Sequence, residues 1–115
     1  MIDTVQTERP TTSSANDTVT VVLSELDPAD GLSQLRWELR DAVLSGARTV
    51  VVDVRDVPTL SSDVVSSLLG VHRLCRVRGG RVELVGCEPG VVELLYRTGL
   101  WRVFHVRDRQ GGWRR

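Results

Sequence analysis

A run of β-branched residues followed by a polar loop and an amphipathic segment constrains this chain most. Residues 48–54 form a near-continuous apolar run that contains four valines, which is typical of a strand covered on both faces. The loop that follows ends in Ser61-Ser62-Asp63, and apolar residues recur at helical spacing over residues 63–77. Gly79-Gly80 ends this helix before a second apolar strand at residues 81–86. A strand–helix–strand unit of this kind predicts two parallel strands joined by a right-handed crossover.

Three further segments extend this unit. Residues 18–23 are rich in Val and Thr and predict an earlier strand, and residues 32–44 carry leucines at steps of three and four, which predicts a helix. Pro89 opens a third helix that ends at Gly99, and residues 100–106 supply a last short strand or edge segment. The alternation predicts an α/β fold with a mostly parallel sheet of four to five strands and three main helices packed on it.

The chain has 115 residues, which suffice for one small domain. We expect residues 1–17 to form a flexible N-terminal arm, with room for a first edge strand, because residues 7–17 are mostly Thr, Ser, Pro and Asn. The domain then spans residues 18–107. Residues 108–115 form a polar C-terminal tail that contains Trp113.

Fifteen arginines balance fifteen acidic residues, and this neutrality argues against general binding to nucleic acid or to an acidic membrane. No apolar run approaches membrane-spanning length. The first residues lack the basic start and apolar core of a signal peptide, so we expect a cytoplasmic protein.

The residues usually found in catalytic sites are scattered. His72 falls on the apolar face of the second helix, which is typical of a core histidine with its hydrogen bonds satisfied, and His105 falls near the last strand. Cys75 and Cys87 have no zinc-ligand spacing and are expected to be reduced thiols. The chain has neither a nucleophile elbow nor a phosphate-binding loop. We therefore expect no enzyme, no metal and no cofactor; a small hydrolase and a redox role for the cysteines are distant alternatives.

Ser62 is the expected N-cap of the second helix, with Asp63 in its first turn. In one interpretation, this hydroxyl only caps the helix and has no further role. It can also accept a phosphoryl group, because the positive end of the helix favours negative charge. Asp63 opposes phosphorylation, since its carboxylate would stand beside the phosphate.

The pattern over residues 18–106 resembles the STAS domain, and within it the bacterial anti-sigma factor antagonists. Four stretches carry the resemblance: Glu25-Leu26-Asp27, residues 50–64, residues 78–86 and residues 94–100. In that family the second strand leads to a loop reading Asp-Ser-Ser/Thr-Gly, whose first hydroxyl residue is phosphorylated by an anti-sigma factor with kinase activity. Alignment through Leu68-Leu69-Gly70 places Ser62 at the acceptor, with Ser61 as the alternative.

Three positions depart from the family motif. Ser61 stands where the family has Asp, Asp63 where it has Ser or Thr, and Val64 where it has Gly. Asp63 adds a fixed negative charge that partly imitates a phosphate, and Val64 adds bulk at the start of the helix.

The resemblance implies one of two functions. In the first, the chain switches between partners: it binds an anti-sigma factor/serine kinase of the histidine-kinase-like ATPase fold, and phosphorylation of Ser62 weakens the complex. The implied contacts are Asp27, Thr59, Leu60, Ser61, Ser62, Asp63 and Val64. In the second, the chain is an unswitched STAS interaction or scaffold module. We expect a monomer or weak dimer in either case.

Overall fold

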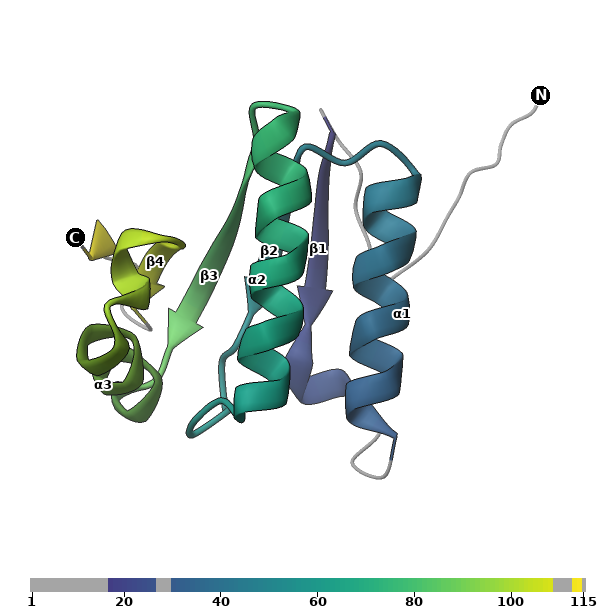
Figure 1. Cartoon of the computed structure of the whole chain (residues 1–115). Helices are drawn as coiled ribbons and strands as arrows, with labels where there is room; N and C mark the ends of the chain where they lie inside the picture. The colour runs from purple at the N-terminus through teal and green to yellow at the C-terminus, as the bar shows by residue number, and fades with distance from the viewer. Residues whose placement is uncertain (1–16, 27–29, 109–112, 115) are drawn as a thin grey trace.

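A five-stranded sheet in the order β1-β2-β3-β4-β5 organises the molecule (Figure 1). The computed structural model describes residues 17–26, 30–108 and 113–114. Its elements are β1 (Thr18–Val22), the 3-10 turn η2 (Leu23–Glu25), α1 (Gly31–Leu44), β2 (Thr49–Asp53), α2 (Ser62–Val77), β3 (Arg81–Cys87), α3 (Pro89–Thr98), the 3-10 turn η3 (Leu100–Arg102), β4 (His105–Asp108) and β5 (Trp113–Arg114). Strands β1 to β4 pair in parallel and β5 pairs antiparallel with β4. The mostly parallel α/β fold predicted from the sequence is therefore confirmed.

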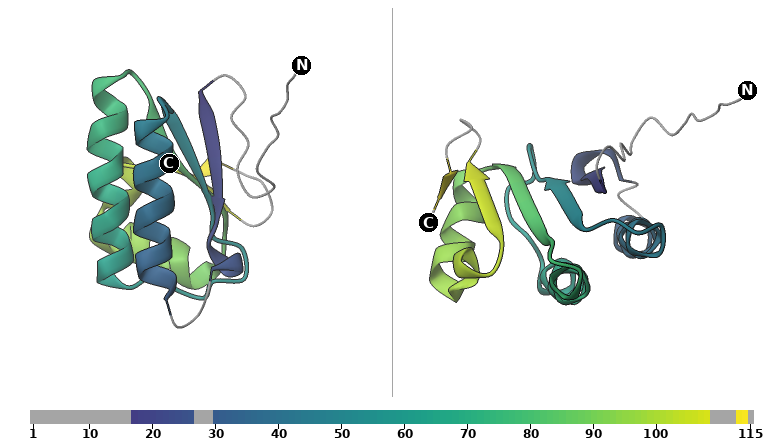
Figure 2. Two further views of the ribbon diagram at one scale, coloured as in Figure 1. Left: turned by 90° about the vertical axis from the view of Figure 1, so that its right-hand side faces the viewer. Right: turned by 90° about the horizontal axis from the view of Figure 1, so that it is seen from above.

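The three α-helices of the described chain lie on one face of the sheet (Figure 2). In β1 and β2, buried residues therefore alternate with partly exposed ones, and the buried side chains Val19, Val21, Val50 and Val52 pack beneath the helices. The expectation that residues 48–54 are covered on both faces is wrong. Valines point to both faces of β2, but Val51, on the face without helices, is only half-buried.

The end of the domain differs from the sequence prediction. Gly99 adopts a left-handed conformation with φ of 79° and leads into η3, so residues 100–104 form a turn where a strand was expected. Strand β4 begins only at His105 and ends at Asp108. Within the expected polar tail, Trp113 and Arg114 form β5 beside Val106 and Arg107. Residues 109–112 and 115 lie outside the described residues, as does the expected arm up to residue 16.

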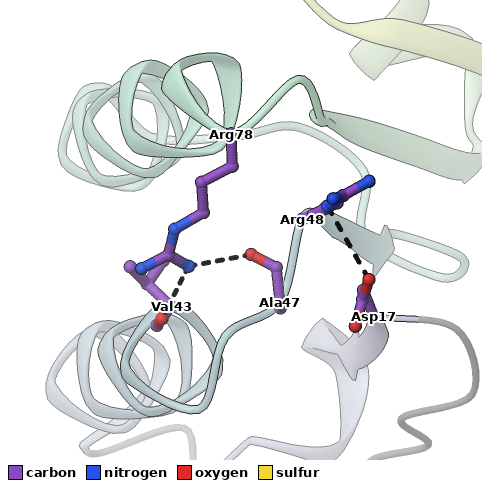
Figure 3. Close-up of polar contacts among 5 residues, drawn as sticks. All are labelled: Asp17, Val43, Ala47, Arg48 and Arg78. Carbon is purple, nitrogen blue, oxygen red and sulfur yellow. Dashed lines mark hydrogen bonds and ion pairs between the residues drawn. The ribbon is translucent and has the colours of Figure 1, made fainter.

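One arginine ties the two longest helices together (Figure 3). The Nη1 atom of Arg78, at the C-terminal end of α2, donates hydrogen bonds to the carbonyls of Val43 (2.8 Å) and Ala47 (3.1 Å). Val43 belongs to the last turn of α1, and its carbonyl also accepts a hydrogen bond from the Gly46 amide at 3.0 Å, just beyond the helix. Arg78 therefore holds the end of α1 against the end of α2, and both helices begin at the carboxyl ends of the parallel strands (Figure 1).

Candidate functional site

The loop between β2 and α2, residues 54–61, leaves the sheet at the carboxyl ends of the parallel strands. Its first residue, Val54, is fully buried, and its amide donates to the carbonyl of Val85 in β3 at 3.0 Å. The amide of Arg55 donates to the Asp53 carboxylate at 2.9 Å, which turns the chain away from the sheet. The side chain of Leu60 is only 6% exposed and fixes the far end of the loop to the core. Both ends of the loop are therefore fixed to the body of the domain, one at Val54 and the other at Leu60.

The connection from β3 to α3 supports this loop from the side. Asp56 has a φ of 67°, a conformation uncommon outside glycine, and its amide donates to the Glu88 carboxylate at 3.1 Å. Gly90, in the first turn of α3, lies so close to the loop that an added Cβ would stand 2.3 Å from the Pro58 carbonyl oxygen. Contacts with a neighbouring connection thus set the path of the loop.

Ser61, not Ser62, is the N-cap of α2. The Ser61 Oγ accepts a hydrogen bond from the Val64 amide at 3.2 Å, and its carbonyl accepts from the Val65 amide at 3.0 Å. The predicted role of Ser62 as the cap is therefore wrong by one position. Ser61 has a φ of −74° and a ψ of 161°, which is the extended conformation that a cap requires.

Ser62 is instead the first residue of the helix. Its side chain is exposed, and its hydroxyl makes no hydrogen bond to the described part of the chain. Asp63 follows, exposed, in the first turn. The amides of Ser62 and Asp63 belong to the first turn, where backbone donors have no partner within the helix. The site offers a free alcohol beside unfilled donors, together with a carboxylate that competes for the same positive potential.

The other predicted contact residues differ in exposure. The side chain of Thr59 is exposed and that of Val64 is half-buried, whereas Leu60 belongs to the core. Asp27 lies outside the described residues. Of the predicted set, the structure brings Thr59, Ser61, Ser62 and Asp63 together on the surface at the start of α2.

A groove between α1 and α2 continues from this surface, and the sequence did not reveal it. It has a volume of about 740 Å³ and is mainly apolar, with Trp37 from α1 and Leu74 from α2 among its lining residues. Trp37 is 63% exposed. Ser67 lies at its near end, where its hydroxyl donates to the Asp63 carbonyl at 3.0 Å and accepts from the Arg36 Nε at 3.4 Å. The position of Trp37 off the apolar stripe of its helix was the one available signal.

His72 lies on the other side of α2 and is 8% exposed. Its ring meets Phe104 edge-on at 5.7 Å, and its Nδ1 has no hydrogen-bond partner in the part of the chain that the structure describes. The prediction of a satisfied core histidine is therefore right about burial and wrong about hydrogen bonding. Burial lowers the pKa of His72, and the positive charges of Arg76 and His105 lower it further.

Cys75 and Cys87 are both buried free thiols. Burial raises the pKa of Cys75, which keeps it in the less reactive thiol form. Within residues 17–26, 30–108 and 113–114, no cluster of three or more His, Cys, Asp or Glu side chains is arranged to hold a metal ion. No helix in these same ranges is both long and apolar enough to cross a membrane.

Comparison with known proteins identifies a matching family and several solved structures with a similar fold. The sequence profile of the family described as Mlab, STAS domain matches residues 11–105. The structure is similar to TM1081 from Thermotoga maritima, with 19% identity and a TM-score of 0.70 over 84% of both chains. It is also similar to the anti-sigma factor antagonist SpoIIAA of Bacillus in its unphosphorylated form, with 24% identity and a TM-score of 0.67 over 85% of this chain and 86% of SpoIIAA.

A third similar structure is a variant of RsbS from Moorella thermoacetica, with 21% identity and a TM-score of 0.67 over 88% of both chains. A search of curated protein sequences gives no significant match. At these identities the solved structures show a shared fold, while the profile covers most of the chain.

Proposed function

Because this chain belongs to the STAS-domain family, we propose that it is a partner-switching regulator that binds an anti-sigma factor with serine kinase activity. Ser62 is the proposed phosphate acceptor. This assignment rests on the different environments of two neighbouring serines. The Ser61 hydroxyl caps α2, whereas the Ser62 hydroxyl is exposed and makes no hydrogen bond to the described part of the chain. A kinase can reach Ser62 without unwinding the helix.

The proposed partner surface begins at Thr59 and covers the exposed start of α2. It continues into the groove between α1 and α2, where Trp37 supplies apolar area and Arg36 supplies positive charge. A kinase of the histidine-kinase-like ATPase fold is the proposed partner. Phosphorylation of Ser62 would add a charge of about −2 beside Asp63 and so change the charge of this surface. The added charge and bulk would then weaken the complex.

One observation favours a second candidate, an unswitched STAS interaction module. The Asp63 carboxylate is exposed in the first turn of α2, where the helix N-terminus stabilises an anion. A permanent charge at this place could hold the surface in one binding state. This candidate requires no phosphoryl transfer, and its complex is insensitive to ATP.

Phosphopeptide mass spectrometry on the chain recovered from its own host separates these functions. Trypsin releases residues 56–73, because arginines precede and end this segment and none lies inside it. The peptide holds Thr59, Ser61, Ser62, Ser66 and Ser67, so fragmentation must locate the phosphate. We expect phosphate on Ser62 in the wild type and in Ser61→Ala, and none in Ser62→Ala.

Binding provides the matched test of the switch. Ser62→Ala should capture an ATPase of the stated fold from host extract whether or not ATP is present, and Ser62→Glu should capture it poorly. Equal capture by both variants, together with unphosphorylated peptide from growing and stressed cells, would reject the switch in favour of the constitutive module.

A further inference from the structure

A basic pocket lies on the side of α2 away from the groove with α1. It has a volume of about 630 Å³ and is formed between the second half of α2, the start of β3, and the segment from η3 to β4. Its lining includes four arginines and both histidines of the chain: Arg73, Arg76, Arg81, Arg102, His72 and His105. His72 follows Ser62 by ten residues, about 15 Å along the helix. The pocket is therefore separate from the proposed phosphorylation site.

The positive charge of this pocket is only partly neutralised. Arg81 pairs with Glu83, with its Nη2 2.8 Å from the carboxylate oxygen. Arg102 lies over the ring of Trp101, a neutral partner, at 5.2 Å from the ring centroid. Arg73 and Arg76 have no carboxylate within ion-pair distance among residues 17–26, 30–108 and 113–114. Three of the four guanidinium groups thus remain without an acidic partner in the described structure.

His72 forms part of the wall of this pocket. It is more than nine-tenths buried, it lines the pocket, and its Nδ1 lacks a hydrogen-bond partner within the described residues. Because that Nδ1 has almost no accessible surface, a ligand in the pocket cannot reach it, and His72 forms part of the pocket wall without donating to the ligand. Burial lowers the pKa of this histidine, and the nearby charges of Arg76 and His105 lower it further.

We propose that this pocket binds a phosphomonoester dianion. Three unpaired guanidinium groups match a doubly charged, tetrahedral group better than a single carboxylate, because each guanidinium can present two parallel N–H donors to phosphate oxygens. The phosphomonoester could belong to a soluble molecule or to a lipid headgroup, since both present the same dianion to the arginines.

Two-dimensional NMR at low ionic strength tests this proposal with inorganic phosphate and glycerol 3-phosphate as soluble probes. We expect saturable shifts of the arginine Nε–Hε and His72 signals, and no such saturation with sodium chloride at matched ionic strength. Vesicle flotation is the second arm, using phosphatidylcholine with and without phosphatidic acid. Binding confined to the phosphatidic acid vesicles would assign the dianion to a lipid.

The variant Arg73→Gln/Arg76→Gln should weaken binding about ten-fold or more in whichever of the two assays detects binding to the wild type, because charged hydrogen bonds are lost. The matched control is Arg40→Gln/Arg97→Gln, which removes two exposed charges from α1 and α3, outside the pocket. Equal weakening in both double variants, or no saturable binding in either arm, would overturn the proposal. Ser62→Ala should bind the probes as the wild type does, so the outcome is independent of the proposed phosphorylation switch.

Discussion

Two adjacent serines with the same chemistry have different roles in this chain. The Ser61 hydroxyl accepts a hydrogen bond from the Val64 amide, whereas the Ser62 hydroxyl projects from the first turn without a hydrogen bond to the described chain. The sequence predicts a serine cap but places it one residue too late, because either serine satisfies the capping preference. The backbone conformation distinguishes them, because Ser61 is extended with a φ of −74° and a ψ of 161°, whereas the helix begins at Ser62.

This division predicts unequal stability effects of alanine substitution. Ser61→Ala should lower the free energy of unfolding by about 1 kcal/mol, because the Val64 amide loses its acceptor. Ser62→Ala should change it by less than about 0.5 kcal/mol, as is usual for an exposed side chain. Urea denaturation of the unphosphorylated proteins measures both values. A larger loss in Ser62→Ala than in Ser61→Ala would contradict the assignment of the cap.

At the scale of elements, local patterns predicted the helices and the first three strands well. The stripes of apolar residues and the glycines at helix ends are local signals, and the structure follows them. The segment after Gly99 was not predictable in this way, since the apolar residues of 100–106 fit a strand as well as the turn η3. The pairing of Trp113 with Arg107 likewise depends on a sheet edge supplied by distant residues.

The close contact between α3 and the loop before α2 predicts that Gly90→Ala is destabilising. Alanine normally stabilises a helix relative to glycine by about 0.5–1 kcal/mol. Here the new Cβ would stand 2.3 Å from the Pro58 carbonyl oxygen, so the loop must move, at a cost of about 1–3 kcal/mol. Thermal and urea unfolding measure the net loss, and amide NMR shifts should report movement over residues 56–63.

Gly70→Ala is the matched control, because a Cβ at this exposed position of α2 meets no atom within 4 Å. We expect this variant to be as stable as the wild type or more so. A stabilised Gly90→Ala protein with unchanged loop signals would show that α3 does not constrain the path of the loop to Ser62.

At the scale of the whole molecule, the order of elements gives the parallel sheet, but not which faces of the sheet the helices cover. Valine fills both sides of β2, so its run of apolar residues suggested two covered faces, while all three α-helices pack on one (Figure 2). The basic pocket was equally hidden. Its arginines come from α2, β3 and η3, and a neutral chain whose basic residues are all arginine gives no local sign that they converge.

The buried histidine connects this arrangement to the pH dependence of folding. The pKa of His72 is lowered in the folded state by burial and by the charges of Arg76 and His105, while the unfolded chain has the ordinary value of about 6.5. Below that value the unfolded state binds more protons than the folded state. The contribution of His72 therefore favours folding above about pH 6.5 and is progressively lost as the pH falls toward the lowered folded-state pKa.

His72→Gln should remove this contribution, so that stability falls less between about pH 7.5 and about pH 5.5 than in the wild type, as measured by urea denaturation at each pH. His105→Gln is the matched control, because it changes an exposed histidine in the same way. It should keep most of the wild-type pH dependence, since burial is the largest cause of the lowered His72 pKa. An unaltered pH dependence in His72→Gln would show that the ring is not held neutral by its surroundings.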